Sequence, residues 1–200
     1  SHAFGPHSKE IEDVYLRFDL EIEQLLTYLD TKVGKNQYVV FLTADHGVAD
    51  IPAYLKKNQI PAGLLTTTQY KTDLNKIMTT KFGDGVWLNE INNNQLFFNH
   101  TLMEQKNVSL DALYQVAKTY LLSQEGIYHV VKLEEVASAT LPTQLKEKVI
   151  NMYIPRLSGD VMMIAEPAWF SGGTKGTTHG SPWRYDTHVP LLWYGWKIPK

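Results

Sequence analysis

The chain has 200 residues, a formal net charge of -2, 44% hydrophobic residues and 20% charged residues, a composition typical of globular proteins. It has no basic excess, so no nucleic-acid partner is expected, and no apolar run is long enough to cross a bilayer, so no membrane partner is expected. It contains seven histidines and no cysteine, so any metal must be held by histidine, carboxylate or hydroxyl groups. The chain starts at Ser1 with neither an initiator methionine nor a signal peptide, so it is expected to come from the middle of a protein.

A long amphipathic helix is predicted from Lys9 to Leu29. Ser8 is a good N-cap residue, and acidic residues in the first turn complement the helix dipole. Its apolar residues recur at spacings of three and four, at Ile11, Val14, Tyr15, Phe18, Ile22, Leu25, Leu26 and Leu29. After a polar stretch, a β-branched and aromatic run predicts a buried strand at residues 38–43. Helix, loop and buried strand predict an αβ unit of a layered sheet.

The middle of the chain differs in character and predicts a small α+β insertion at residues 61–155, between core α/β parts at 1–60 and 156–200. Residues 86–90 and 95–99 flank an asparagine-rich turn and predict a hairpin. Ser109 is expected to cap a helix, and residues 127–133 predict a strand. Residues 66–85 are polar and of mixed residue types, and no helix or strand is assigned to them. His100 and His129 fall within the insertion and are expected to be surface or packing residues.

Residues 161–165 predict another buried strand, and residues 189–194 a final strand. Between them lies a glycine- and threonine-rich loop at 172–180. The loop has some likeness to a phosphate-binding loop, but Lys175 precedes the second glycine where the phosphate-binding pattern requires it to follow. A flexible loop that carries His179 to a site is the better interpretation.

Asp45, His46 and Gly47 follow the predicted strand 38–43 directly. Ligands of open α/β sheets bind at the carboxyl ends of strands, and an Asp-His pair there offers two metal ligands above a glycine that permits a sharp turn. The same three residues are also ordinary turn residues, with Asp45 capping the next element. Both interpretations stay open on these residues alone. His2, His179 and His188 also lie in loops between predicted core elements, where functional sites are commonly built.

Three motifs together resemble the alkaline phosphatase superfamily. They are Thr-Ala-Asp-His-Gly at 43–47, Thr-Thr-His-Gly-Ser at 177–181 and Asp-Thr-His-Val-Pro-Leu at 186–191. The opening His-Ala-Phe-Gly-Pro-His-Ser at 2–8 resembles the type I phosphodiesterase/nucleotide pyrophosphatase branch, and within it the bacterial PafA-like alkaline phosphatases. The resemblance implies an α/β fold with a layered sheet and flanking helices, present here in part.

The resemblance also implies two zinc ions. It assigns Asp45 and His46 to one zinc, and His2 and His179 to the other. His188 matches the family motif without being a ligand there, so it is expected to support the site from beside the ligands or to pack nearby. Each zinc has only two ligands in this chain, fewer than the three or four that a stable site requires. His7 has no family role and is expected to be exposed.

The implied function is that of a zinc-dependent phosphomonoesterase acting on small phosphate esters through a phosphothreonine or phosphoserine intermediate. The nucleophile is expected in an N-terminal half absent from this chain, because Thr177 and Thr178, beside a metal ligand, do not match the family's arrangement. Alternatives are a phosphodiesterase or nucleotide pyrophosphatase, an inert fragment, or a binding module with an aromatic platform. Trp183, Tyr185, Trp193, Tyr194 and Trp196 could supply that platform, although Trp193 and Tyr194 suit strand packing. The resemblance implies periplasmic or secreted localisation.

Overall fold

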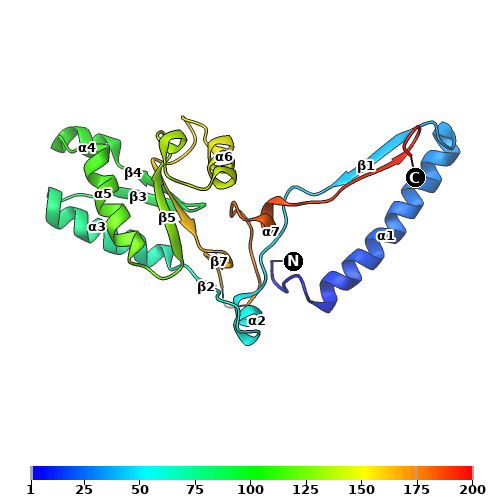
Figure 1. Ribbon diagram of the computed structural model, residues 1–200, viewed down its shortest axis with the longest axis horizontal. Coiled ribbons are helices and arrows are strands. Elements are labelled where there is room, and N and C mark those ends of the chain that lie inside the picture. Colours follow the sequence, from blue (N-terminus) through cyan, green and yellow to red (C-terminus); the bar gives the residue numbers. More distant parts are fainter. Residues whose placement is uncertain (1, 174, 200) are drawn as a thin grey trace.

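The computed structural model describes residues 2–173 and 175–199. It has two parts, which meet near the N-terminus (Figure 1). One part, called the arm here, consists of helix α1 (Lys9–Leu29) and the paired strands β1 (Val39–Thr43) and β8 (Leu191–Gly195). The other is an α+β unit built on a four-stranded sheet. Sheets with flanking helices confirm the predicted α/β class.

Helix α1 begins and ends where its periodicity predicts. The Ser8 hydroxyl accepts a hydrogen bond of 3.3 Å from the Ile11 amide, which is the predicted N-cap. The helix continues into a short π-helical turn, Asp30–Gly34. None of its residues is buried, and side chains such as Tyr15 and Leu16 are 69% and 64% exposed. The predicted apolar stripe is therefore present but uncovered in this chain.

The prediction that β1 is buried is wrong. Its burial alternates between exposed and intermediate, and Phe41 is 61% exposed. Within the described residues β1 pairs only with β8, in antiparallel register from Val39 opposite Gly195 to Thr43 opposite Leu191. A two-stranded ribbon has no second layer to cover its faces, which is why an apolar sequence is left in solvent.

The α+β unit contains an antiparallel sheet in the order β3-β4-β6-β5. The predicted hairpin is confirmed as β3 (Leu88–Asn92) and β4 (Gln95–Phe98), and the predicted strands as β5 (Ile127–Lys132) and β6 (Val161–Ala165). Helix α5 (Leu110–Leu122) is capped by Ser109 as predicted. Three helices of this unit were not predicted, namely α3 (Thr67–Phe82), α4 (His100–Lys106) and α6 (Thr143–Met152).

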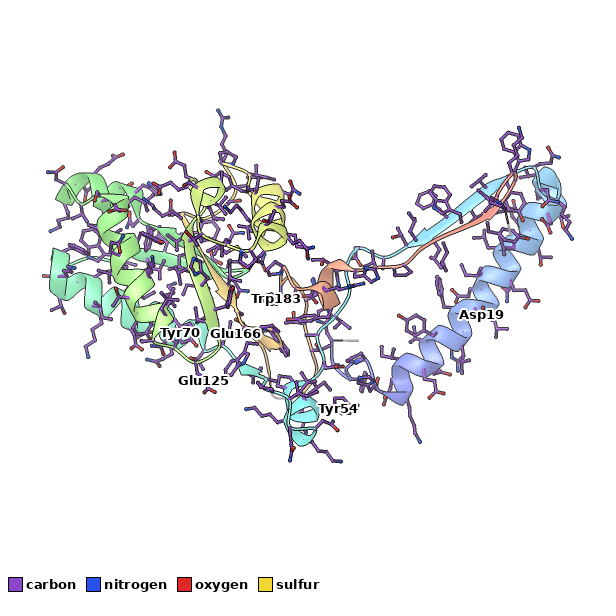
Figure 2. All side chains as sticks on the ribbon, viewed as in Figure 1. Asp19, Tyr54, Tyr70, Glu125, Glu166 and Trp183 are labelled. Atoms are coloured by element: carbon purple, nitrogen blue, oxygen red, sulfur yellow. The ribbon has the colours of Figure 1, made fainter. Side chains whose placement is uncertain are left out.

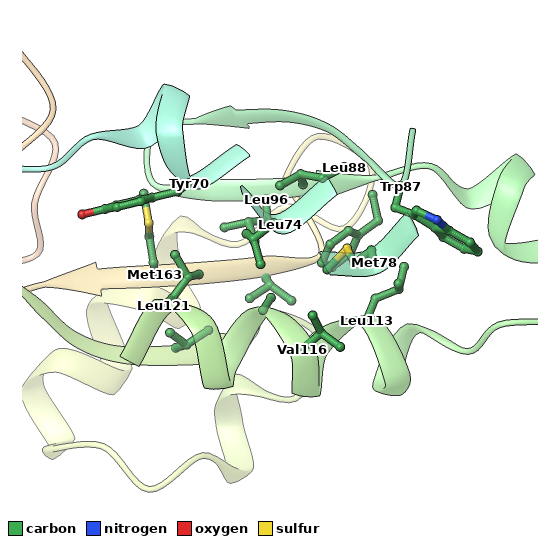
Figure 3. Close-up of a cluster of buried hydrophobic side chains, with 14 of the residues drawn as sticks. Tyr70, Leu74, Met78, Trp87, Leu88, Leu96, Leu113, Val116, Leu121 and Met163 are labelled. Atoms are coloured by element: carbon green, nitrogen blue, oxygen red, sulfur yellow. The ribbon is translucent and has the colours of Figure 1, made fainter. Parts of the chain in front are cut away.

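Both faces of this sheet are covered, so β6 is buried along its whole length. Met163 faces α3 and α5, while its neighbours Met162 and Ile164 face α6 and the 3₁₀ turn Val136–Ser138, as the alternation of a strand requires. Figure 3 shows the larger core, where Leu74 and Met78 of α3 and Leu113 of α5 pack with Trp87, all four fully buried.

The boundaries of the predicted insertion stay predictions. Strand β6, which sequence analysis assigned to the third segment, pairs with β4 and β5 of the second. Short elements join the two parts: α2 (Pro52–Lys57), β2 (Gly63–Leu64) paired in parallel with β7 (Trp169–Phe170), and α7 (Arg184–Thr187). Trp183, labelled in Figure 2, fastens the start of α7 to the sheet, since its indole donates a hydrogen bond of 2.9 Å to the Ala165 carbonyl.

Candidate metal centre

Three of the predicted ligands meet between the two parts of the molecule. The imidazole rings of His46 and His179 are stacked, with centroids 3.4 Å apart, and the His2 ring lies 5.2 Å from that of His179. Asp45 joins them, because its carboxylate lies 3.5 Å from Nε2 of His46. Four positions spread over the whole chain are thus brought to one place. Their roles as ligands stay predictions.

The His2 ring is oriented by the loop that carries His179. Nδ1 of His2 lies 3.0 Å from the carbonyl oxygen of Thr177, and the Thr177 amide donates to the His2 carbonyl at 2.9 Å. Since a carbonyl oxygen can only accept, Nδ1 carries the proton and Nε2 is left with a free lone pair. That is the tautomer in which a histidine can bind a metal.

His46 is oriented in the same way from its own turn. Its Nδ1 lies 2.7 Å from the carbonyl oxygen of Gly47, so Nε2 again has the lone pair. Asp45 takes part in the turn through Oδ1, which accepts from the His46 amide at 3.0 Å. Its side chain is 86% exposed, and Oδ2 is directed toward Nε2 of His46. The residue therefore serves the local turn and leaves a carboxylate oxygen available to a metal ion.

Gly47 is needed for close approach of two chain segments. Its amide donates a hydrogen bond of 2.7 Å to the Asp186 carbonyl, and the Val48 amide donates at 3.1 Å to the Tyr185 carbonyl. A Cβ atom at position 47 would collide with that carbonyl oxygen of Tyr185. The expected reason, a sharp turn, is not the constraint, because Gly47 is not among the residues with positive φ.

The buried residue Thr177 connects the loops of the site by hydrogen bonds. It is 7% exposed, and its hydroxyl donates to the carbonyl oxygen of Ala49. The Ala49 amide in turn donates to the Thr178 carbonyl at 3.3 Å. The loops that bear His2, His46 and His179 are therefore joined by hydrogen bonds to one another.

His179 is kept in its neutral form by its surroundings. Burial lowers its pKa, and the nearby His46 and His2 lower it further, while Asp186 and Asp45 act in the opposite direction. Neutral imidazole is the form that coordinates a metal ion. At neutral pH the ring therefore has a nitrogen lone pair to offer.

The other histidines lie apart from this cluster. His188 is exposed, and within the described residues its side chain forms no hydrogen bond or ion pair. His7 is exposed as predicted and forms an ion pair of 2.8 Å with Asp50. His100, exposed, pairs with Asp160 at 2.7 Å, and His129 has a pKa lowered by burial and by Lys118, so both are surface or packing residues as predicted.

Sequence reasoning missed Asp186, which is 4% exposed and lies beside the cluster. It belongs to the same Asp-Thr-His-Val-Pro motif as His188, and the motif was the available signal. A carboxylate in such a motif indicates a functional site as well as a histidine does, but only the histidine of the motif was considered.

Two cavities adjoin the cluster. The one of about 400 Å³ contains Asp45, His46 and His179 in its wall, together with Lys148 of α6. The ammonium group of Lys148 donates to the Pro182 carbonyl at 2.9 Å and to the Thr187 hydroxyl at 2.8 Å. The other, of about 260 Å³, is lined by His179 and by the Asn92–Asn94 turn of the β3–β4 hairpin. There is room beside the histidines for a small polar ligand.

Comparison with protein families decides the assignment. The profile of the type I phosphodiesterase / nucleotide pyrophosphatase family matches residues 1–190. The chain belongs to this family. It is therefore a member of the alkaline phosphatase superfamily, as the motifs indicated.

Individual members of the family match almost the whole chain. A calcium-transporting ATPase from Myroides odoratus is 38% identical over 199 residues, alkaline phosphatase PhoV from Synechococcus elongatus 37% over 198, and alkaline phosphatase PafA from Elizabethkingia meningoseptica 35% over 199. Each match covers 98% of this chain and 35–36% of the relative. The chain thus spans little more than a third of the length of these relatives.

The folds agree as well. The crystal structure of wild-type alkaline phosphatase PafA superimposes with a TM-score of 0.93 at 34% identity, over 98% of this chain and 38% of PafA. A PafA variant with four substitutions gives a TM-score of 0.92. The arrangement of arm and α+β unit is therefore that of a phosphatase of this family.

The candidate ligands are of the types that bind zinc, the metal that the family resemblance implies. There are too few of them to surround an ion. Three imidazoles and a carboxylate are the nitrogen and oxygen donors that zinc accepts, and in two of the imidazoles Nδ1 already bonds to a carbonyl oxygen. Across residues 2–173 and 175–199, no group of three or more candidate side chains is arranged to enclose an ion. The residues present could hold a metal ion from one side.

Proposed function

We propose that this chain is the C-terminal part of a zinc-dependent phosphomonoesterase. Asp45 and His46 hold one zinc ion, and His2 and His179 hold the other. The observation that carries the proposal is the convergence of three imidazoles at the end of β1, two of them with Nδ1 bonded to a carbonyl and Nε2 free. Such hydrogen bonds are how proteins orient metal-binding histidines.

The residues of this chain act by fixing the positions of the two positively charged zinc ions. A pair of zinc ions, when bound, neutralises a phosphoryl group and stabilises the attacking and leaving oxygens. The role of His2, Asp45, His46 and His179 is to fix where that charge lies, which is most of what phosphoryl transfer asks of a protein. The nucleophile, a threonine or serine that becomes phosphorylated, belongs to a part of the protein outside these residues.

Monoesters are the favoured substrates because two of the similar proteins are alkaline phosphatases by name. The alternative, a diester or nucleotide pyrophosphate substrate, is supported by the description of the family as a whole. The resemblance to bacterial alkaline phosphatases is also the ground on which we propose a periplasmic or secreted location. Within the described residues, no helix combines the length and apolar character that crossing a membrane takes.

The proposal can be tested in a chimera. The matched segment of Elizabethkingia meningoseptica PafA, 36% of its length, is replaced by this chain. We expect the chimera to hydrolyse a chromogenic phosphate monoester, to lose activity on chelation and to regain it with zinc. The matched control is the same chimera with His179→Ala, which should fold but lose at least about 100-fold in activity.

The alternatives predict different outcomes of the same assay. A diesterase would hydrolyse a chromogenic phosphate diester faster than the monoester. An inert chain would give a folded chimera, with the thermal unfolding of PafA, that hydrolyses neither substrate. The isolated 200-residue chain is expected to be inactive in all cases.

The partner that the arm implies is the rest of the same polypeptide. The apolar stripe of α1 and the faces of the β1–β8 ribbon are uncovered, with Val14 at 56% and Trp193 at 52% exposure. Contiguous apolar surface of this kind marks an interface. The relatives have almost two thirds of their length outside the matched segment, which is enough chain to cover it.

This interface is tested by substitution in the chimera and in the isolated chain. Val14→Asp should lower the melting temperature of the chimera by several degrees and leave that of the isolated chain unchanged. Asp13→Asn is the control, because two residues after Ile11 it lies about 160° around the helix from the middle of the stripe. Equal effects of Val14→Asp in both proteins would show that the stripe is solvent-facing in the complete enzyme.

A further inference from the structure

The carboxylate of Asp186 is buried with only one of its oxygens satisfied. Oδ2 accepts a hydrogen bond of 2.7 Å from the Ser181 amide. Oδ1 is the one buried side-chain oxygen or nitrogen within the described residues that has no hydrogen-bond partner. Leaving a carboxylate oxygen buried and unpaired is costly, so a donor is expected to reach it in the functional state.

Asp186 lies at the junction of the two segments that carry the proposed ligands. Its backbone carbonyl accepts from the Gly47 amide, next to His46, and its side chain holds Ser181, two residues from His179. Asp186 and His179 are both found in the walls of the two cavities beside the site. Its negative charge also acts on His179, where it opposes the lowering of the pKa.

The three imidazoles of the cluster differ in one respect. Those of His2 and His46 each donate through Nδ1 to a carbonyl oxygen. The ring of His179 makes no hydrogen bond within the described residues, although it is the central ring of the three. One imidazole thus lacks an acceptor, and the buried carboxylate beside it lacks a donor.

We propose that Asp186 is a positioning residue of the metal centre, whose Oδ1 accepts a hydrogen bond from one ring nitrogen of His179 and so directs the other ring nitrogen to the metal. A carboxylate acceptor fixes the tautomer and makes the imidazole a stronger donor to the metal than a carbonyl would. The inference rests on the proposed metal site, since it assigns a role toward that site.

The test uses the PafA chimera that contains this chain, with zinc alone as the ligand. Zinc affinity, measured by competition with a chelator, should fall about 10- to 100-fold in Asp186→Asn, which keeps an acceptor for Ser181 but removes the charge. Asp160→Asn is the matched control, since Asp160 is a largely buried carboxylate that accepts from Phe98 and His100 within the α+β unit. Its substitution should leave zinc affinity unchanged.

A second measurement separates positioning from a merely structural role. Nitrogen-15 NMR of the zinc-loaded chimera should show His179 with one metal-bound nitrogen and one N–H that is protected from solvent exchange. In Asp186→Asn that protection should be lost, while the tautomers of His2 and His46 stay as they are.

The outcomes separate this inference from the proposed function. Equal zinc affinity and an equally protected His179 N–H in Asp186→Asn would overturn the role of Asp186 alone. Failure of the unsubstituted chimera to bind zinc would instead count against the metal site itself, and the role of Asp186 with it. If Asp186→Asn does not fold, an unprotected His179 N–H in the unsubstituted chimera overturns the inference without any variant.

Discussion

The amide of Gly47 donates a hydrogen bond of 2.7 Å to the carbonyl oxygen of Asp186, and this contact joins the turn that bears Asp45 and His46 to helix α7. The approach leaves no room for a Cβ atom at position 47. We therefore expect Gly47→Ala to push the turn away from Tyr185, to cost about 1–3 kcal/mol of stability and to weaken zinc binding at least tenfold. Urea unfolding and zinc titration measure the two effects.

Gly173→Ala is the control for that substitution. Position 173 is exposed, and a Cβ atom there would make only an ordinary contact with the Lys175 carbonyl. Stability and zinc affinity should both stay close to those of the unsubstituted chain. Similar losses in the two variants would mean that added bulk, and not the approach at Gly47, is responsible.

Thr177→Val tests the hydroxyl that joins the loops. The variant keeps the shape of the side chain but leaves the buried Ala49 carbonyl without its donor, at an expected cost of about 1–3 kcal/mol. Thr177→Ser retains the donor and should lose less. Urea unfolding measures the loss of stability in both variants. An equal loss in the two would contradict a role for the hydroxyl.

Leu113→Ala tests the core of the α+β unit. Leu113 is fully buried between α5 and the sheet, so the cavity should cost about 2–5 kcal/mol. Leu122→Ala, in the same helix but 42% exposed, should cost less than about 0.5 kcal/mol. Comparable costs in chemical unfolding would contradict this packing.

Tyr38 predicts a pH-dependent link between α1 and β1. Its hydroxyl donates to Asp30 at 2.7 Å, and this hydrogen bond, with burial, raises the pKa of Tyr38 from 10.0 to about 12. Because the pKa is raised in the folded state, the hydrogen bond contributes its full stability below pH 10 and loses it as the pH rises toward 12. The melting temperature of Tyr38→Phe should therefore approach that of the unsubstituted chain above pH 10. A constant difference would contradict this link.

The elements that were predicted are those with a strong local signal. Ser8 and Ser109 cap their helices as expected, and the hairpin around Asn92–Asn94 forms where its turn residues indicate. Helix α3 was missed because threonines, which favour helices weakly, obscure the buried spacing of Tyr70, Leu74 and Met78. The exposure of β1 was not predictable, because whether a strand is covered depends on segments far away in the chain.

Local pattern accounts for only part of the candidate site, and the roles of its residues as ligands stay predictions. Asp45 and His46 follow a predicted strand, where an ordinary turn was an equally open interpretation, whereas His2 and His179 depended on the resemblance to a family. The hydrogen bonds that orient the rings join residues far apart in sequence, such as His2 with Thr177, so no local pattern reveals them. The motif at 186–191 contains Asp186, but the burial of its carboxylate and its unpaired oxygen exist only in the folded chain.

The most direct test is a zinc titration by calorimetry of the metal-free PafA chimera that contains this chain, with His179→Ala and His100→Ala as paired variants. His179 belongs to the cluster, while His100 lies in the α+β unit and pairs with Asp160. We expect the unsubstituted chimera and its His100→Ala variant to bind zinc alike, and the His179→Ala variant to bind it at least tenfold more weakly. Equal affinity in all three, or no binding by the unsubstituted chimera, would contradict a zinc site at these histidines.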